Sequence, residues 1–133
     1  MIAPARRAAY EVVRRVFEED AYADRALATA VGELDERDRA LAQRLAYGTV
    51  QRRRTLDFGI EQLGRRPVRK LDGPVRTSLR LGAYQLAFTE LAEHAVVDDA
   101  VELVRAARLE RAVPFTNAVM RRLAERLMQI SCD

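Results

Sequence analysis

The sequence is poor in the residues from which most catalytic and metal sites are built. Its 133 residues contain one histidine, His94, and one cysteine, Cys132. A single histidine excludes a metal site with several histidine ligands, and no nucleophile motif accompanies it to form a catalytic triad. Cys132 has no partner for an internal disulfide, which fits a reducing compartment. We interpret His94, at the start of an expected helix, as a structural residue.

Loops that bind nucleotides are also missing. The sequence has neither a Gly-x-Gly-x-x-Gly run after a strand nor a Walker-type lysine loop, so dinucleotides and triphosphates lack their usual sites. The adjacent carboxylates Asp98 and Asp99 would point about 100° apart on a helix, which is a poor geometry for sharing one catalytic site. We therefore predict a chain without catalytic machinery of its own, which binds no cofactor and no metal.

Long apolar runs are absent. None approaches the roughly 20 residues that a helix needs to cross a bilayer, and residues 1–7 lack the hydrophobic stretch of a signal peptide. We expect a cytoplasmic protein that does not contact a membrane. A content of 49% hydrophobic and 32% charged residues excludes a disordered polar tract, and the length predicts a single domain over residues 1–133.

Lysine is nearly absent, because Lys70 is the only lysine among 23 basic residues. Arginine suits phosphate and stacks on bases, but arginine with abundant alanine also follows from a GC-rich genome. Position is therefore more informative than number. Residues 52–80 hold nine basic and three acidic residues, whereas residues 81–104 hold five acidic residues and neither arginine nor lysine. This polarised charge indicates that one side of the molecule meets a polyanion.

Apolar residues recur with helical periodicity along the chain, and no segment shows the alternation of a strand, which predicts an all-α fold. We expect helices after Pro4, over residues 23–31, over 35–63, from Asp72 onward, over 95–109 and over 114–128. The helix that begins near Asp72 is apolar over most of its circumference and should be central. Asp35 and Asp72 are the expected N-terminal caps of their helices.

Arg52 does not fit the long helix expected over residues 35–63, because it falls in the middle of that helix's apolar stripe. Two interpretations remain open. A bend near Gly48 would change the helical phase and carry Arg52 outward. Alternatively, Arg52 faces a cleft between two helical subdomains and pairs with an acid, since a buried unpaired guanidinium is very costly.

Taken together, the residues resemble the NusB-like RNA-binding family, in particular the N-terminal domain of RsmB-type (Fmu/Sun) ribosomal RNA cytosine-C5 methyltransferases. The segment Tyr47-Gly48-Thr49 and the residues at 55–58 are closer to the methyltransferase branch than to the antitermination branch. The order and spacing of several short segments carry the resemblance, namely residues 5–9, 21–23, 35–40, 47–54, 71–76, 79–86, 94–103 and 115–122.

The resemblance implies a NusB-like fold of two packed three-helix bundles and a role in binding RNA. The methyltransferase domain of the relatives, which supplies S-adenosylmethionine and the active-site cysteines, would be fused to this chain or separate from it. We predict that basic residues contact phosphates of a structured ribosomal RNA, and we expect recognition of shape more than of bases because aromatic residues are few. The predicted residues are Arg6, Arg7, Arg14, Arg52, Arg53, Arg54, Arg65, Arg66, Arg69, Lys70 and Arg76. The alternative is a protein-interaction module, similar to the antitermination factor, whose acidic residues 90–102 dock a basic ribosomal protein.

Overall fold

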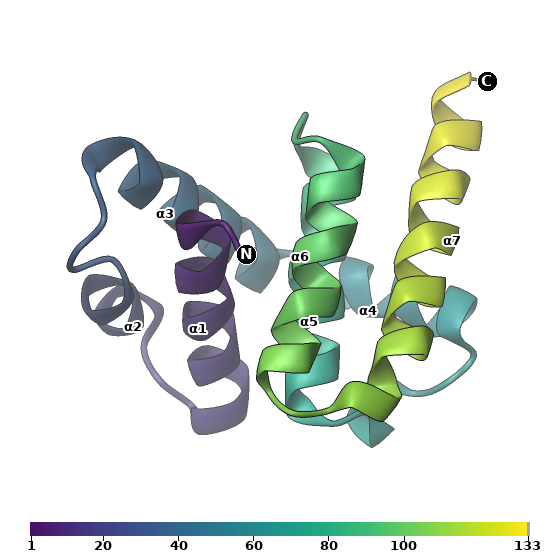
Figure 1. The fold of residues 1–133 in the computed structure, drawn as a ribbon, viewed down its shortest axis with the longest axis horizontal. Helices are drawn as coiled ribbons and strands as arrows, with labels where there is room; N and C mark the ends of the chain where they lie inside the picture. The colour runs from purple at the N-terminus through teal and green to yellow at the C-terminus, as the bar shows by residue number, and fades with distance from the viewer. Residues whose placement is uncertain (133) are drawn as a thin grey trace.

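The all-α prediction is confirmed in a computed structural model, which describes residues 1–132 and contains no strand within that range (Figure 1). Seven α-helices are joined by short loops, two of which contain a turn of 3₁₀ helix. The α-helices are α1 (Pro4–Glu19), α2 (Ala23–Ala30), α3 (Glu36–Gln51), α4 (Arg53–Gly64), α5 (Gly73–Phe88), α6 (Glu93–Ala106) and α7 (Val113–Cys132), and the 3₁₀ turns are η1 (Val68–Lys70) and η2 (Glu110–Ala112).

The helices form two groups that share one apolar core. Helices α1, α2 and α3 pack together on the left of Figure 1, and α4 to α7 pack together on the right. Helices α1 and α3 both contact α5, which joins the groups and is largely buried, as its apolar circumference predicts. The second group therefore has four helices where the resemblance implies three, because the long helix expected over residues 35–63 is two helices.

The break between α3 and α4 lies at Arg52. This residue ends α3 and precedes α4 with φ −110° and ψ 20°, outside the helical region, and its side chain is exposed. The chain therefore does change direction, as the first interpretation holds, but four residues beyond Gly48. Gly48 has a different role, because a Cβ there would lie 2.1 Å from Cζ of Tyr84. Its missing side chain lets the Tyr84 ring of α5 pack directly on α3.

The alternative interpretation of Arg52, an ion pair with an acid in a cleft, is wrong. No carboxylate pairs with it among the described residues. Its guanidinium carbon instead lies 4.4 Å from the ring centroid of Phe88 and 5.8 Å from that of Tyr84. These two rings are stacked on each other with centroids 5.5 Å apart. Arg52 is thus a cation placed against an aromatic pair at the protein surface.

Only one of the two predicted caps forms. The Asp35 carboxylate accepts a hydrogen bond of 2.8 Å from the backbone N–H of Asp38, as expected for an N-cap. Asp72 occupies the N-cap position of α5, but its side chain accepts no capping hydrogen bond there. Pro74 is in the first turn of that helix, where the missing N–H costs nothing.

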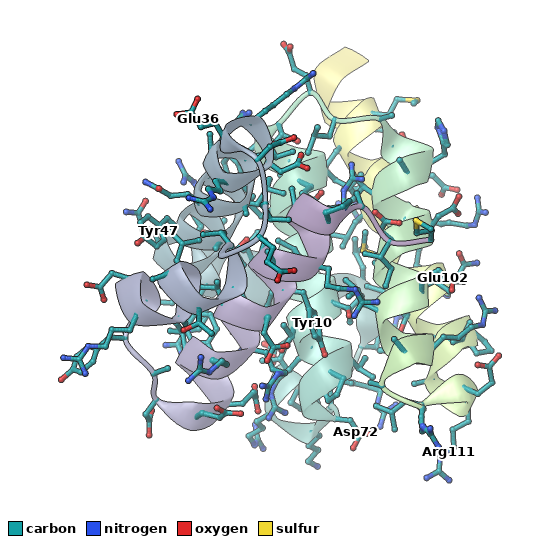
Figure 2. All side chains as sticks on the ribbon, turned by 60° about the vertical axis from the view of Figure 1, so that its left-hand side comes forward. Tyr10, Glu36, Tyr47, Asp72, Glu102 and Arg111 are labelled. Atoms are coloured by element: carbon teal, nitrogen blue, oxygen red, sulfur yellow. The ribbon has the colours of Figure 1, made fainter. Side chains whose placement is uncertain are left out.

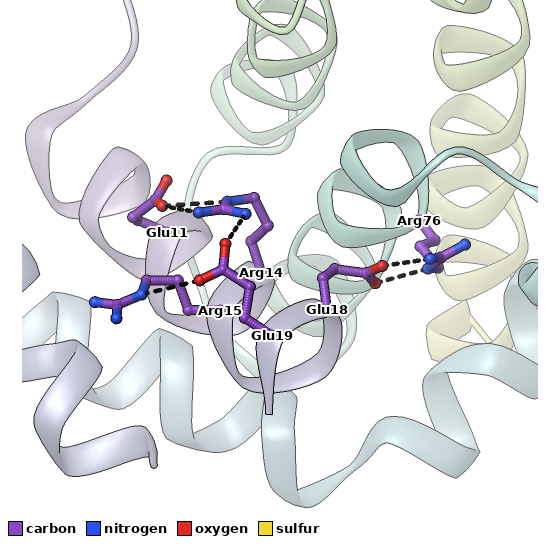
Figure 3. A network of polar contacts seen from close by, with 6 residues as sticks. All are labelled: Glu11, Arg14, Arg15, Glu18, Glu19 and Arg76. Carbon is purple, nitrogen blue, oxygen red and sulfur yellow. Dashed lines mark hydrogen bonds and ion pairs between the residues drawn. The ribbon is translucent and has the colours of Figure 1, made fainter. Parts of the chain in front are cut away.

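Helix α1 is bonded near both ends to the second group of helices. Near its start, the Arg6 guanidinium donates to Asp99 of α6 at 3.0 Å and to the amide oxygen of Gln85 of α5 at 2.7 Å. Near its end, Glu18 accepts two hydrogen bonds from the Arg76 guanidinium of α5 (Figure 3). Because these pairs sit at opposite ends of α1, they fix both its position and its direction against α5 and α6.

Candidate nucleic-acid interface

The exposed basic residues at 52–54 and 65–70 flank helix α4, whose own sequence decides which of its faces is buried. Leu56 and Ile60 are 4% and 0% exposed and point into the core. Asp57 accepts hydrogen bonds of 2.7 and 3.0 Å from the Arg80 guanidinium of α5. These apolar contacts and this two-bonded ion pair hold α4 in one orientation, with the remaining positions turned to solvent.

Both acidic residues of α4 are engaged within the protein. Asp57 pairs with Arg80, and the Glu61 carboxylate accepts a hydrogen bond of 2.8 Å from the backbone N–H of Val68. Of the nine basic residues at 52–80, Arg76 and Arg80 are paired with acids, which leaves seven exposed: Arg52, Arg53, Arg54, Arg65, Arg66, Arg69 and Lys70. Asp72 is the one fully exposed acid in this range. The exposed charge is therefore more one-sided than the sequence count.

The first cluster of these cations lies at the start of α4. Arg52, Arg53 and Arg54 line a shallow hollow of about 260 Å³ together with residues 50, 51 and 55. Arg53 also lies 5.5 Å from the ring centroid of Phe17 of α1. Acidic residues usually occupy the first turn of a helix because they favour the positive end of its dipole. The three adjacent arginines at the start of α4 therefore do not stabilise the helix itself. They do favour the binding of an anion there.

The second cluster follows the end of α4. Arg66 lies 5.3 Å from the ring centroid of Phe115, and it lines a hollow of about 280 Å³ with Lys70, Asp72 and Arg111. Figure 2 shows Arg111 projecting from the fold at the same end as Asp72. Sequence reasoning did not select Arg111, because it follows α6, far along the chain from residues 65–70. Only the fold brings it into this cluster.

Three of the predicted phosphate contacts are already bonded within the protein. Arg6 is 9% exposed and bonded to Asp99 and Gln85, so its assignment to an RNA-contacting surface is corrected to a buried structural role. Figure 3 shows the other two, Arg14 and Arg76. Arg14 bonds Glu11 and Glu19 of its own helix, and Arg76 bonds Glu18.

The same bonds shift the protonation equilibria of these groups. The carboxylates of Glu11 and Glu19 raise the pKa of Arg14, and the Glu18 carboxylate raises the pKa of Arg76. In return, the Arg76 guanidinium lowers the pKa of Glu18. The charges are matched inside the protein, so Arg14 and Arg76 contribute little net charge to the surface.

Arg7 remains exposed, but it does not lie with the α4 clusters. It lines a separate hollow of about 580 Å³ between α1 and the segment that joins α2 to α3, in the company of Glu11 and Glu33. The acids around it reduce its attraction for a phosphate. The structure therefore places the predicted residues at 52–54 and 65–70 at the two ends of α4 and leaves the first-helix arginines outside that surface.

The described residues offer no other chemistry. They contain no cluster of three side chains able to hold a metal ion, and none of their helices is long and apolar enough to cross a membrane. His94 is exposed near the start of α6. The side chain of Cys132 lies outside the described residues.

These observations define the class of protein: an all-α domain with clusters of exposed basic residues at the two ends of its fourth helix. Comparison with known sequences then gives the family. The chain belongs to the NusB family, whose model matches residues 3–125. The NusB-like resemblance inferred from the sequence is thereby confirmed.

The curated relatives are larger proteins. The chain is 36% identical over 121 residues to a probable ribosomal RNA small subunit methyltransferase B from Synechocystis, and the match covers 89% of this chain and 27% of the relative. It is 33% identical to the ribosomal RNA small subunit methyltransferase B of Pseudomonas putida, with 88% and 27% covered. The chain thus spans about a quarter of the length of these methyltransferases.

Solved structures agree with the fold. A protein chain in the crystal structure of a plectonemic RNA supercoil superposes with a TM-score of 0.87 at 25% identity, covering 94% of both chains. NusB from T. maritima superposes with a TM-score of 0.82 at 23% identity, covering 94% of this chain and 93% of that one. A chain in the structure of antitermination factors NusB and NusE with double-stranded RNA gives a TM-score of 0.83 at 24% identity, covering 92% and 95%.

Proposed function

We propose that this chain is an RNA-binding domain that recognises ribosomal RNA for a cytosine-C5 methyltransferase. The observation that carries the proposal is the exposed charge at residues 52–80, where seven exposed cations face one exposed acid. Cations in such an arrangement bind the RNA backbone, because each neutralised phosphate releases condensed counterions. The relatives named as small subunit methyltransferases support ribosomal RNA as the ligand.

The mechanism is electrostatic and geometric. The arginines at 52–54 and the basic residues at 65–70 and 111 contact phosphates from the two ends of α4. Arg65 follows Arg54 by eleven positions, so the ends of the surface are about 17 Å apart along the helix axis. Phosphate contacts give affinity and orientation. The methyl transfer itself belongs to a catalytic domain, fused or separate, as in the relatives.

The second candidate function, docking of a basic protein on the acidic residues at 90–102, has weaker support. Asp99 is buried in its pair with Arg6, and Glu102 is paired with Arg105. Glu90, Glu93 and Asp98 remain as exposed acids. Three exposed carboxylates are fewer than the seven exposed cations at the two ends of α4, so the charge favours RNA.

A salt titration tests the proposal. RNA affinity should fall steeply with salt, and replacing Arg53 and Arg54 by alanine should reduce the slope of log K against log salt by about one to two units. The matched control replaces Arg37 and Arg44, two exposed arginines of α3, which removes the same charge elsewhere. An unchanged slope in the first variant, or an equal reduction in the control, would refute the assignment to α4.

A second measurement tests whether methyl transfer requires a catalytic domain that this chain does not contain. The purified 133-residue chain should neither bind S-adenosylmethionine nor transfer its methyl group to RNA. Isothermal titration with the cofactor and incorporation of labelled methyl into ribosomal RNA check this directly. Methylation by this chain alone would contradict its role as a binding domain.

A further inference from the structure

The solvent face of α4 carries an aromatic residue between two arginines. Arg54, Phe58 and Gln62 follow one another at intervals of four residues, so they form a row along one side of the helix, and Arg65 follows at the C-terminal cap of α4. All four are exposed, and the Phe58 side chain is 67% exposed. Leu56 and Ile60, which are buried, point in the opposite direction.

A single exposed apolar side chain is ordinary in itself. Phe58 differs in its electrostatic surroundings, because Arg54 precedes it by one turn and Arg65 follows it by two. The charge of Asp57 is balanced by Arg80, and Glu61 is half-buried with its carboxylate turned to the backbone N–H of Val68. The ring therefore lies on a surface that attracts a polyanion, and an aromatic ring is the group on which bases stack.

Among the exposed aromatic residues, Phe58 has the freest ring. Phe88 is 41% exposed, but the Tyr84 ring and the Arg52 guanidinium already lie against it. Tyr22 is 71% exposed and carries the Arg25 guanidinium 5.4 Å from its ring centroid. It belongs to the other group of helices.

We propose that Phe58 is a stacking platform for an unpaired base of the bound RNA, with Arg54 and Arg65 on phosphates to either side. This inference rests on the proposed RNA-binding function and goes beyond it in assigning a base contact. The stretch from Arg54 to Arg65 is about 17 Å long, which accommodates about five nucleotides at the ~3.4 Å rise of a stacked strand. A base in a duplex is stacked and paired, so its face is not accessible to Phe58.

The proposal adds a contact to one base to the expected recognition of shape more than of bases. Phosphate contacts by arginines do not distinguish an unpaired strand from a duplex of the same charge. A stacked base does, because only an unpaired nucleotide can turn its face toward the protein. We therefore expect the site to select a loop, a bulge or a strand end of the RNA.

The test compares two RNAs of about ten nucleotides per strand, an unstructured single strand and a perfect duplex. Phe58→Leu should weaken binding to the single strand about tenfold, the lower part of the range for loss of one base–aromatic stack, and leave binding to the duplex within twofold. Tyr22→Leu is the matched control, because it removes an exposed aromatic residue beside an arginine and should leave both affinities unchanged. Circular dichroism melts check that both variants fold.

Fluorescence gives an independent readout, because the chain contains no tryptophan. In Phe58→Trp the single indole should be quenched by the unpaired RNA and not by the duplex, whereas Tyr22→Trp should respond to neither. Full single-strand affinity of Phe58→Leu, an equal loss on the duplex, or an unquenched indole at position 58 would overturn the stacking assignment. A Phe58-dependent dimer in sedimentation would instead make the ring a protein contact and also overturn it.

Failure of the proposed RNA-binding function and failure of the base contact give different results in these titrations. If the unaltered chain binds neither RNA at low salt, the RNA-binding proposal falls and the stacking platform falls with it. If it binds both RNAs through the Arg53–Arg54 pair and Phe58→Leu has no effect, only the base contact is lost. The two results are read from the same titrations.

Discussion

The buried ion pair between Arg6 and Asp99 allows the sharpest test of how this fold is held together. The two side chains are 11% and 10% exposed, and the Nη1–Oδ2 distance is 3.0 Å. Arg6 also donates to Gln85, and Asp99 also accepts from the backbone N–H of Ala3 at 3.1 Å. Arg6→Ala would leave the Asp99 carboxylate buried with the Ala3 N–H as its remaining partner.

The expected cost follows from this burial. Removing one partner of a buried ion pair usually lowers the free energy of unfolding by about 3–5 kcal/mol, because the remaining charge is buried away from water without an opposite charge beside it. Removing both charges avoids that penalty. Arg6→Met combined with Asp99→Leu should therefore cost about 2 kcal/mol less than the sum of the two single variants, within the range of couplings measured for contacting residues.

Urea unfolding followed by circular dichroism at neutral pH measures these free energies, provided that the slope with urea stays constant across the variants. A loss below about 1 kcal/mol for Arg6→Ala would refute the reasoning, because surface arginines typically cost less than that. RNA titrations on the double variant supply the functional half of the test. Unchanged salt dependence would confirm that Arg6 stabilises the fold and does not contact RNA.

Three further predictions concern single positions. Gly48→Ala should destabilise the fold by about 1–3 kcal/mol, seen as a lower melting temperature, because the new Cβ would collide with the Tyr84 ring and force it to move. Arg76 lowers the pKa of Glu18 below its ordinary value of 4.5, so the pair contributes its full stability above that pH and loses it as the pH falls; the stability difference between the wild type and Glu18→Gln should therefore narrow on acidification in urea melts. Arg52→Ala should lower the free energy of unfolding by about 0.5–1 kcal/mol, the value of an exposed cation–aromatic contact. A loss near 3 kcal/mol in denaturant melts would instead support the interpretation that Arg52 is paired with a buried acid.

Helices with clear apolar periodicity could be predicted from the sequence. The helix that begins at Pro4 and the mostly apolar helix that begins after Asp72 appear as α1 and α5. They could be predicted because the apolar residues of each recur with one helical period along its whole length. The Asp35 cap could also be predicted, since it depends on residues three positions apart. The packing of two helical groups came from the family resemblance instead.

The break at Arg52 could be suspected but not located. The misplaced arginine indicated a change of helical phase, yet the position of the break depends on how α4 docks on α5 through the ion pair of Asp57 and Arg80. That contact joins residues 23 positions apart. Periodicity within one helix carries no information about it, and the sequence therefore predicted one helix where there are two.

Only part of the candidate site could be predicted from the sequence. The clusters at 52–54 and 65–70 each consist of residues close together in the sequence, so their exposure could be anticipated. Arg6, Arg14 and Arg76 resemble them in sequence but are bonded to acids, and for Arg6 the partner Asp99 is 93 positions away. Arg111 entered the site through the opposite effect, since the fold brings a distant cation to the end of α4.

The attachment of α1 at both of its ends has a consequence for cooperativity. A helix bonded only at one end could detach with α2 and α3 while α4 to α7 stayed folded. With Arg6 fixed to α6 and Glu18 fixed to α5, detachment must break two partly or fully buried charge pairs and open the common core at once. Amide hydrogens in the two groups should then exchange through the same global opening, so an arriving ligand meets a preformed surface that requires little ordering on binding.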